Sequence, residues 1–338
     1  MSKSVITVVI PHCLTVKWTQ ICIASMEEFK NDVPYDILII DNSPKHMRSG
    51  LEGITKTCLG EGVRIEDNKY SVRGHAGALD YGLSIIDTPY LFASETDCQA
   101  LRDHFLDRFV DKMKDKYVAM AGWYWPGFDR EYIHCGGCLY STDIVNKIKE
   151  LLKFNTNYMI CYGTDLKKRK MLDQTIINEI HDPLHGPFSE LRGFQEIWSF
   201  RDIKWYQEPG AWLYYRCRSE YECVEMPGLL TYHENPHVGS GTWFIDNQTD
   251  SEEDSFFVHH WGGTVSHAWE TRKVIMDWER KALPYWIERE DRIWRKVVPA
   301  AARNKVLQMG LVKSGDEEID FILNHPNVKD VKQEEIIY

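Results

Sequence analysis

The fold is decided by one stretch of sequence, Pro89-Tyr90-Leu91-Phe92-Ala93-Ser94-Glu95-Thr96-Asp97. Its apolar middle, Tyr90–Ala93, predicts a short strand that is buried on both faces, as in a parallel sheet. Two carboxylates, Glu95 and Asp97, follow at the carboxyl end of this strand. Open α/β sheets bind their ligands at that edge, so the stretch predicts both a strand and a ligand site.

Strands and helices are expected to alternate around this stretch. The buried apolar runs Val5–Ile10 and Ile37–Ile40 enclose Trp18–Phe29, whose apolar residues recur at helical spacing. A strand, a helix and a strand in this order predict a βαβ unit with a right-handed crossover. Further strands are expected at Val63–Ile65 and Val118–Ala121, and further helices at Gly74–Ile86 and Phe105–Met113. The fold class is therefore α/β, with a mainly parallel sheet flanked by helices.

The later sequence has a different texture. From about Trp123 onward it is rich in aromatic residues, Gly and Pro, and strand-like pieces remain at Cys138–Tyr140 and Tyr221–Val224. The last seventy residues or so read as helices. We expect one domain over residues 1–265, with halves 1–122 and 123–265, followed by a helical C-terminal extension over 266–338.

Composition narrows the class of protein. The 338 residues carry 40 Lys and Arg against 51 Asp and Glu, a net charge of −11, which disfavours wholesale nucleic-acid binding. No apolar run is long enough for a membrane span, and the N-terminal run is too short for a signal peptide. Nine cysteines are an odd number, which favours reduced thiols. We therefore expect a cytoplasmic protein without a transmembrane segment.

Common nucleotide-binding signatures are missing from the sequence. The turn after the first expected strand reads Pro11-His12-Cys13-Leu14, where a dinucleotide-binding protein has a glycine-rich turn. The segment Gly239-Ser240-Gly241-Thr242 lacks the lysine of a phosphate-binding P-loop. An NAD enzyme and a P-loop nucleotidase are both disfavoured.

The pair Glu95 and Asp97 can be read in two ways. Alternate residues of an extended segment point in similar directions, so the two carboxylates can share a hard divalent cation. Alternatively, they form the acidic N-terminus of a helix, where a carboxylate favours the helix dipole.

Four elements in order resemble the family 2-like glycosyltransferases of the GT-A fold, which use nucleotide sugars. They are the strand ending Val9-Ile10-Pro11, the strand ending Ile39-Ile40-Asp41, the small-residue helix Gly74–Leu83, and the stretch Pro89–Asp97. The last resembles the family's Asp-x-Asp metal motif. The sequence departs from it at Glu95, which replaces the first Asp.

The resemblance implies how the donor is held. The donor would be a nucleoside diphosphate sugar, with UDP as the expected nucleotide, bound by the half 1–122, while 123–265 binds the acceptor. Asp41 would form a hydrogen bond with the nucleobase, and the loop containing Pro11 and His12 would form the bottom of the nucleobase pocket. Arg73 or His75 would contact phosphate or ribose.

The resemblance also implies a divalent cation, Mn²⁺ or Mg²⁺, held by Asp97 with help from Glu95. A late histidine completes such a site in many of these enzymes, and the candidates are His260, in a His-Trp-Gly-Gly segment, and His233. Imidazole together with carboxylates suits Mn²⁺ better than Mg²⁺.

An inverting transferase needs a carboxylate that removes the proton of the acceptor hydroxyl. The resemblance implies that this base is Glu208, which precedes Arg216 in the sequence. Gln207 replaces one acidic residue of the family's pattern. Glu196, Asp202 and Asp173 are the alternatives.

An aromatic segment and a pair of cysteines each have a functional and a purely structural interpretation. Trp123-Tyr124-Trp125 fits a loop that lines a sugar cleft, and it fits ordinary packing equally well. Cys135 and Cys138 form one Cys-x-x-Cys, but a structural zinc site needs a second pair, so zinc is disfavoured.

Other functions stay open at this point. A sugar nucleotidyltransferase shares the α/β sheet and the metal, but it usually carries a glycine-rich basic loop after the first strand. A non-catalytic module that binds nucleotide sugars or glycans is the second alternative. The acceptor is a glycan, a lipid-linked glycan or another hydroxyl-bearing molecule, and a modified DNA base is conceivable but disfavoured by the net charge.

Overall fold

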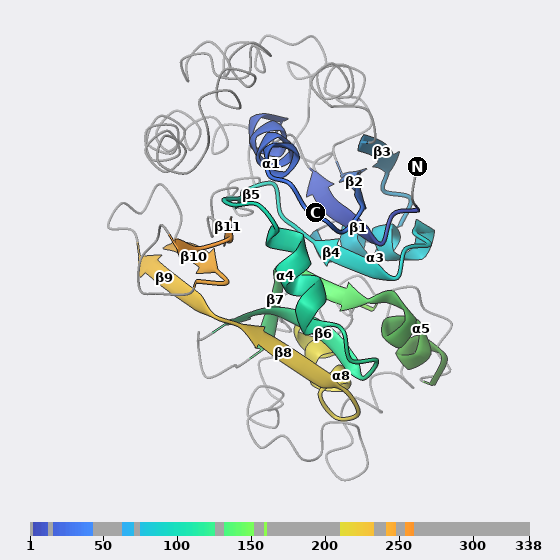
Figure 1. The fold of residues 1–338 in the computed structure, drawn as a ribbon. Helices are drawn as coiled ribbons and strands as arrows, with labels where there is room; N and C mark the ends of the chain where they lie inside the picture. Colours follow the sequence, from blue (N-terminus) through green and yellow to red (C-terminus); the bar gives the residue numbers. More distant parts are fainter. Residues whose placement is uncertain are drawn as a thin grey trace, which may run out of the picture.

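The structure is a computed structural model, and it describes residues 3–12, 16–42, 63–70, 75–125, 132–151, 159–160, 210–232, 241–247 and 254–259. The expected extension 266–338 and the domain boundary at residue 265 lie outside these residues. The described strands form two sheets, and helices cover the larger one (Figure 1).

The larger sheet has seven strands in the order β3-β2-β1-β4-β7-β6-β8. These are β1 (Ile6–His12), β2 (Tyr35–Asp41), β3 (Val63–Asp67), β4 (Tyr90–Ala93), β6 (Val118–Trp125), β7 (Tyr132–Ser141) and β8 (Glu222–Met226). Only β7 runs antiparallel to its neighbours within this sheet, while the other adjacent strands pair in parallel. The expected mainly parallel sheet is confirmed.

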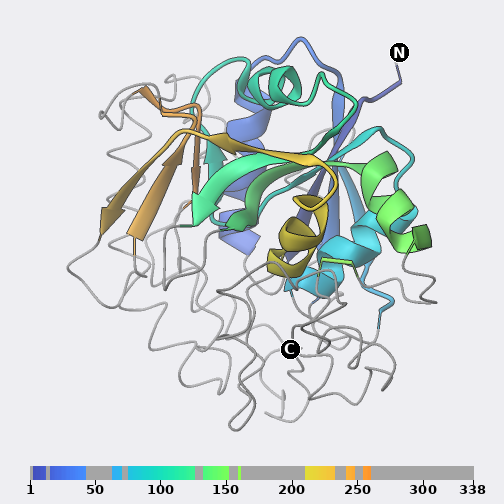
Figure 2. The same cartoon turned by 90° about the horizontal axis from the view of Figure 1, so that it is seen from below.

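Helices lie on both faces of this sheet. They are α1 (Val16–Glu28), α3 (His75–Ile85), α4 (Phe105–Lys112), α5 (Thr142–Leu151) and α8 (Ala211–Cys217). Figure 2 shows α3, α5 and α8 together on one face and α4 on the other. At Gly82 in α3 a Cβ would lie 2.5 Å from Cγ1 of Val9, so this glycine lets the helix approach β1 closely.

The smaller sheet has four strands in the order β5-β11-β10-β9. They are β5 (Cys98–Ala100), β9 (Gly228–Tyr232), β10 (Gly241–Ile245) and β11 (Phe257–His259), and all neighbours pair antiparallel. Pro227 separates β8 from β9, so the chain passes there from the larger sheet to the smaller one. β5 begins one residue after Asp97, which places this edge of the smaller sheet beside the predicted metal motif.

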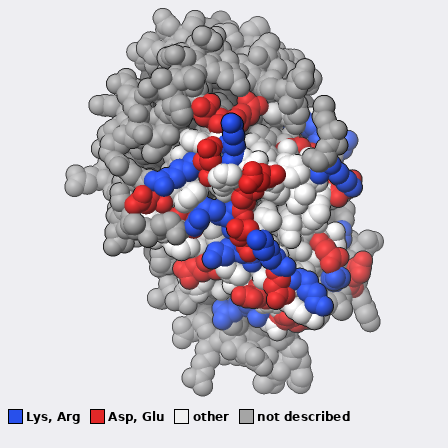
Figure 3. Space-filling model, in the orientation of Figure 1, with Lys and Arg blue, Asp and Glu red and all other residues white. Residues whose placement is uncertain are grey.

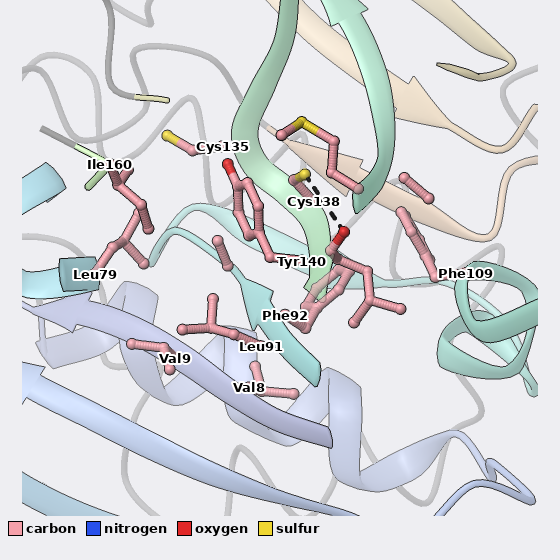
Figure 4. Close-up of a cluster of buried hydrophobic side chains, with 14 of the residues drawn as sticks. Val8, Val9, Leu79, Leu91, Phe92, Phe109, Cys135, Cys138, Tyr140 and Ile160 are labelled. Carbon is pink, nitrogen blue, oxygen red and sulfur yellow. Dashed lines mark hydrogen bonds between the residues drawn. The ribbon is translucent and has the colours of Figure 1, made fainter. Parts of the chain in front are cut away.

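The core fills the space between the sheet and its helices (Figure 4). Val8, Val9, Leu91 and Phe92 on the central strands are completely buried. The Phe92 ring packs edge-on against Phe109 of α4, with a centroid distance of 5.0 Å, and edge-on against Phe257 of β11, at 5.3 Å. Aromatic pairs of this geometry add roughly 0.5–1.5 kcal/mol each beyond their buried area. They tie β11 to β4 and α4.

Within the described residues, the elements predicted from buried runs and helical spacing are present, with ends shifted by a few residues. The sugar-cleft interpretation of Trp123 is wrong, because Trp123 lies inside β6 and is only 1% exposed. The packing interpretation holds for this residue, since its ring stacks on that of His134.

Candidate active site

The residues predicted to bind the nucleobase lie at the carboxyl edge of the sheet. Pro11 and His12 end β1, Asp41 ends β2, and His12 is directly opposite Asp41 in the parallel register. His12 and Asp41 are 2% and 6% exposed. The structure therefore brings these three predicted residues together on adjacent strands, as expected for a ligand edge.

His12 is held as a neutral ring. Its Nδ1 lies 2.7 Å from Oγ1 of Thr19 on α1. Burial lowers the pKa of His12, and the nearby Asp41 carboxylate only partly opposes this effect. A neutral imidazole can line a nucleobase pocket but does not supply a positive charge for phosphate.

The predicted metal motif is a tight turn that leads into the smaller sheet. The backbone N–H of Cys98 donates to the carbonyl of Glu95 at 3.1 Å, so the segment turns back on itself before β5 begins. In the pairing of β5 with β11, Cys98 is directly opposite His259. This register sets His259 next to the motif.

Glu95, Asp97 and His259 form the centre of the site. Nε2 of His259 lies 3.5 Å from Oε2 of Glu95 and 3.6 Å from Oδ1 of Asp97. His259 and Asp97 are each 1% exposed. Neither ring nitrogen of His259 makes a hydrogen bond to the described residues. A buried imidazole without a hydrogen bond, facing two carboxylates, fits a divalent cation.

Charges inside this cluster shift each other's pKa. Burial alone would raise the pKa of Glu95, but His75, His259 and His134 together hold it well below its usual value. Burial alone would lower the pKa of His259, but Glu95 and Asp97 raise it above its usual value. The cluster therefore strongly favours an ionised Glu95.

Gly136 on β7 fits directly against this cluster. A Cβ on this residue would lie 2.7 Å from Oε1 of Glu95 and 3.1 Å from Cε1 of His259. Its N–H donates to Nδ1 of His134 at 2.9 Å, and its carbonyl accepts from Nε1 of Trp123 at 2.8 Å. Trp123 and His134 thus fix the glycine backbone against the two candidate ligands.

His75 borders the cluster on the other side of Glu95. Its Nδ1 lies 3.7 Å from Oε1 of Glu95, and both ring nitrogens lie 3.9–4.0 Å from Sγ of Cys135. His75 begins α3, so a helix N-terminus points at this part of the site. The predicted residues Glu95, Asp97 and His75 are therefore brought together.

Other predicted residues lie outside the part of the chain that the structure describes: Arg73, Glu208, His233, His260, and the alternative bases Glu196, Asp202 and Asp173. Sequence reasoning missed His259, His134 and Gly136. The buried strand pattern of Phe257-Val258-His259 was the available signal for His259, since it favours a strand whose end carries the imidazole.

Comparison with known proteins shows which family the N-terminal half of the chain resembles. Residues 7–174 match the model of Glycosyl transferase family 2, and this match contains the Glu95–Asp97 motif. The N-terminal half of the chain is therefore similar to glycosyl transferase family 2.

Several solved structures are similar to this chain. One is the mannosyltransferase PcManGT from Pyrobaculum calidifontis in complex with GDP-Man and Mn²⁺, with 14% identity and a TM-score of 0.36 over 47% of this chain and 50% of that one. Another is S. aureus TarS 1–349, with 9% identity and a TM-score of 0.33 over 46% and 51% of the two chains. The chain thus spans about half the length of these proteins. No curated protein matches it.

Among the described residues, no helix is both long and apolar enough to cross a membrane.

Proposed function

We propose that this protein is a glycosyltransferase that moves a sugar from a nucleoside diphosphate sugar, with UDP as the expected nucleotide, to an acceptor hydroxyl, with inversion and with the help of a divalent cation. The observation that carries the proposal is the convergence of Glu95, Asp97 and His259. Oxygen and imidazole ligands of this kind suit Mn²⁺. When bound, the cation neutralises the charge that develops on the leaving diphosphate.

Donor binding is proposed for the edge formed by β1 and β2. Asp41 accepts hydrogen bonds from the nucleobase, and Pro11 and His12 line its pocket. His75 and Arg73 are proposed to contact the phosphates or ribose. Support comes from the register of His12 with Asp41 and from the position of His75 at the start of α3.

Glu208 is the proposed general base. It accepts the proton of the acceptor hydroxyl while the hydroxyl oxygen bonds to the anomeric carbon and the bond to the diphosphate oxygen breaks. Support comes from Gly210, two residues later, where a Cβ would lie 3.3 Å from Cβ of Cys135. Gly210 also donates its N–H to the carbonyl of Ile160 at 2.9 Å.

The proposed acceptor is a glycan or another hydroxyl-bearing molecule. On the described part of the face in Figure 3, acidic and basic side chains are interspersed and do not gather by sign. Together with the net charge of −11, this arrangement predicts weak binding of duplex DNA. A steep loss of DNA affinity with added salt would instead favour a DNA acceptor.

A panel of UDP-, GDP- and dTDP-sugars tests the function. Thermal unfolding and donor hydrolysis are measured with Mn²⁺, with Mg²⁺ and with EDTA. One donor should raise the unfolding temperature in the presence of metal, because a ligand of the folded state stabilises it. The absence of any shift or hydrolysis across the panel, with and without metal, would refute the proposal.

Replacing Asp97 by Asn tests the cation site. We expect transfer to fall at least about 100-fold, because the remaining ligands hold the cation poorly. Asp254→Asn is the control, since Asp254 precedes β11 of the same small sheet but pairs with the exposed Arg102 at 3.1 Å. Equal turnover in the two variants would remove Asp97 from the site.

Replacing Glu208 by Gln tests the base. Transfer should be lost while donor binding, measured by thermal shift with Mn²⁺, stays at the wild-type level. Unchanged turnover would reassign the base to Glu196, Asp202 or Asp173.

A further inference from the structure

Cys135 and His75 form a second group of potential ligands beside Glu95. Sγ of Cys135 lies 4.0 Å and 3.9 Å from the two ring nitrogens of His75, and Nδ1 of His75 lies 3.7 Å from Oε1 of Glu95. The potential ligand atoms of the three residues all lie within 4.8 Å of one another. They come from three elements: the start of α3, the turn after β4, and β7.

The donor set differs in kind from that of the proposed transfer cation. A thiolate, an imidazole and a carboxylate favour zinc-class ions, whereas Mn²⁺ and Mg²⁺ favour oxygen ligands. Tetrahedral bonds of ordinary zinc length place sulfur and nitrogen roughly 3.5 Å apart. The thiol and imidazole of this structure need to move by only a few tenths of an ångström to reach that separation. None of the six described cysteines forms a disulfide.

The two oxygens of Glu95 face the two groups separately. Oε2 is 3.5 Å from Nε2 of His259, while Oε1 is 3.7 Å from Nδ1 of His75. Nδ1 of His134 is also 4.0 Å from Oε1, but it already accepts the N–H of Gly136. His134 therefore supports the site through Gly136. The Glu95 carboxylate borders two groups of potential ligands, one with His259 and one with His75.

We propose that His75, Cys135 and Oε1 of Glu95 bind a thiophilic divalent cation of the zinc class, at a position distinct from that of the transfer cation. The two cations share Glu95 and repel each other. Zinc therefore raises the Mn²⁺ concentration needed for half-maximal transfer, a consequence that rests on the proposed function. The binding itself does not depend on it.

Cobalt(II) is the probe, added to the reduced full-length chain. Cobalt bound to a thiolate gives a charge-transfer absorption in the near ultraviolet. We expect this absorption in the wild type and its loss from the Cys135→Ser chain. Cys138→Ser is the matched control, because Cys138 is an equally buried thiol on the same strand whose Sγ contacts the carbonyl of Leu139. The control should keep the full signal.

An equal cobalt signal in the Cys135→Ser and wild-type chains, or no signal in the wild type, would overturn the inference. Circular dichroism checks that the variants fold. If Cys135→Ser does not fold, Cys135→Ala and His75→Asn replace it, and His75→Asn keeps the thiol but should weaken cobalt binding at least about tenfold. Unchanged cobalt affinity in the His75→Asn chain would also overturn the inference.

A second measurement separates this inference from the proposed function. Zinc should raise the Mn²⁺ requirement of transfer in the wild type but not in the Cys135→Ser chain, whose basal transfer should be unchanged. A cobalt signal in a chain that transfers no sugar would refute only the proposed function. Transfer without any cobalt signal would refute only the second cation site.

Discussion

The bare Cα of Gly136 lies against Glu95 and His259, and its backbone is held on both sides by His134 and Trp123. A methyl group there must displace Oε1 of Glu95, 2.7 Å away. Gly136→Ala should therefore raise the Mn²⁺ concentration for half-maximal transfer by about 10- to 100-fold, an effect typical of a disturbed supporting residue. The measurement is a Mn²⁺ titration of donor hydrolysis.

Gly122→Ala is the control for Gly136→Ala. A Cβ at Gly122 would meet Cγ2 of Ile133 at 2.6 Å, an equally tight contact that lies among apolar side chains. This variant should unfold at a lower temperature and keep the wild-type Mn²⁺ requirement. The same Mn²⁺ requirement in wild type and Gly136→Ala would show that the glycine does not position the ligands.

At the residue scale, the sequence predicts Glu95 and Asp97 because they follow directly on a buried strand. It gave His260 and His233 as the candidate histidines, both outside the described residues, and it missed the neighbouring His259. A shift of one residue in a strand turns every side chain to the other face. The position of the His259 side chain depends on the register of β11 against β5, which is a contact between distant parts of the chain.

At the scale of elements, an ion pair with a buried carboxylate fastens the smaller sheet to α4. Arg108 of α4 donates to both carboxylate oxygens of Asp246, which follows β10 and is 1% exposed. The Arg108 guanidinium also stacks over the Phe256 ring, 4.2 Å from its centroid. Because Phe256 immediately precedes β11, the pair fixes the hairpin that carries His259.

Arg108→Ala should lower the free energy of unfolding by about 1–3 kcal/mol, because it takes the guanidinium away from the buried Asp246 carboxylate. Denaturant unfolding measures the loss. Arg102→Ala is the matched control: the Arg102–Asp254 pair is about two-fifths exposed on each side, so its removal should cost less than about 1 kcal/mol. Similar losses in both variants would contradict a special role for the Arg108–Asp246 pair.

The elements that sequence reasoning found and those it missed differ in length and in how they are stabilised. β1, β2 and β4 are continuous apolar runs, and the α1 and α4 segments carry a helical stripe, so each is recognisable locally. β5 and β11 have three residues each, and they become strands by pairing with each other and, for β11, with β10. Their formation depends on tertiary contacts, which a local pattern does not contain.

At the scale of the whole molecule, His134 makes stability depend on pH. Burial lowers its pKa to about 3, against an ordinary value of 6.5. Below pH 6.5 the unfolded chain binds a proton that the folded chain excludes, so stability falls as the pH falls from 6.5 towards 3. Relative to His134→Asn, the wild type should lose on the order of 2–3 kcal/mol more between pH 6.5 and pH 4.

Denaturant unfolding at several pH values tests this expectation, and asparagine keeps an acceptor for the N–H of Gly136. His104→Asn is the control. Asp107 raises the pKa of the exposed His104, so removing this histidine should not reduce the loss of stability in acid. Parallel pH profiles for the wild type and His134→Asn would mean that His134 takes up its proton in the folded state.

The order of the elements along the chain has a consequence for biogenesis. A ribosome delivers Glu95 and Asp97 early, together with the central strands that position them, but β11 is the last described element to emerge. A nascent or prematurely released chain can thus form much of the larger sheet while it still lacks His259. In the described part of the chain, the proposed cation site is completed last, so metal-dependent turnover would report that synthesis has passed residue 259.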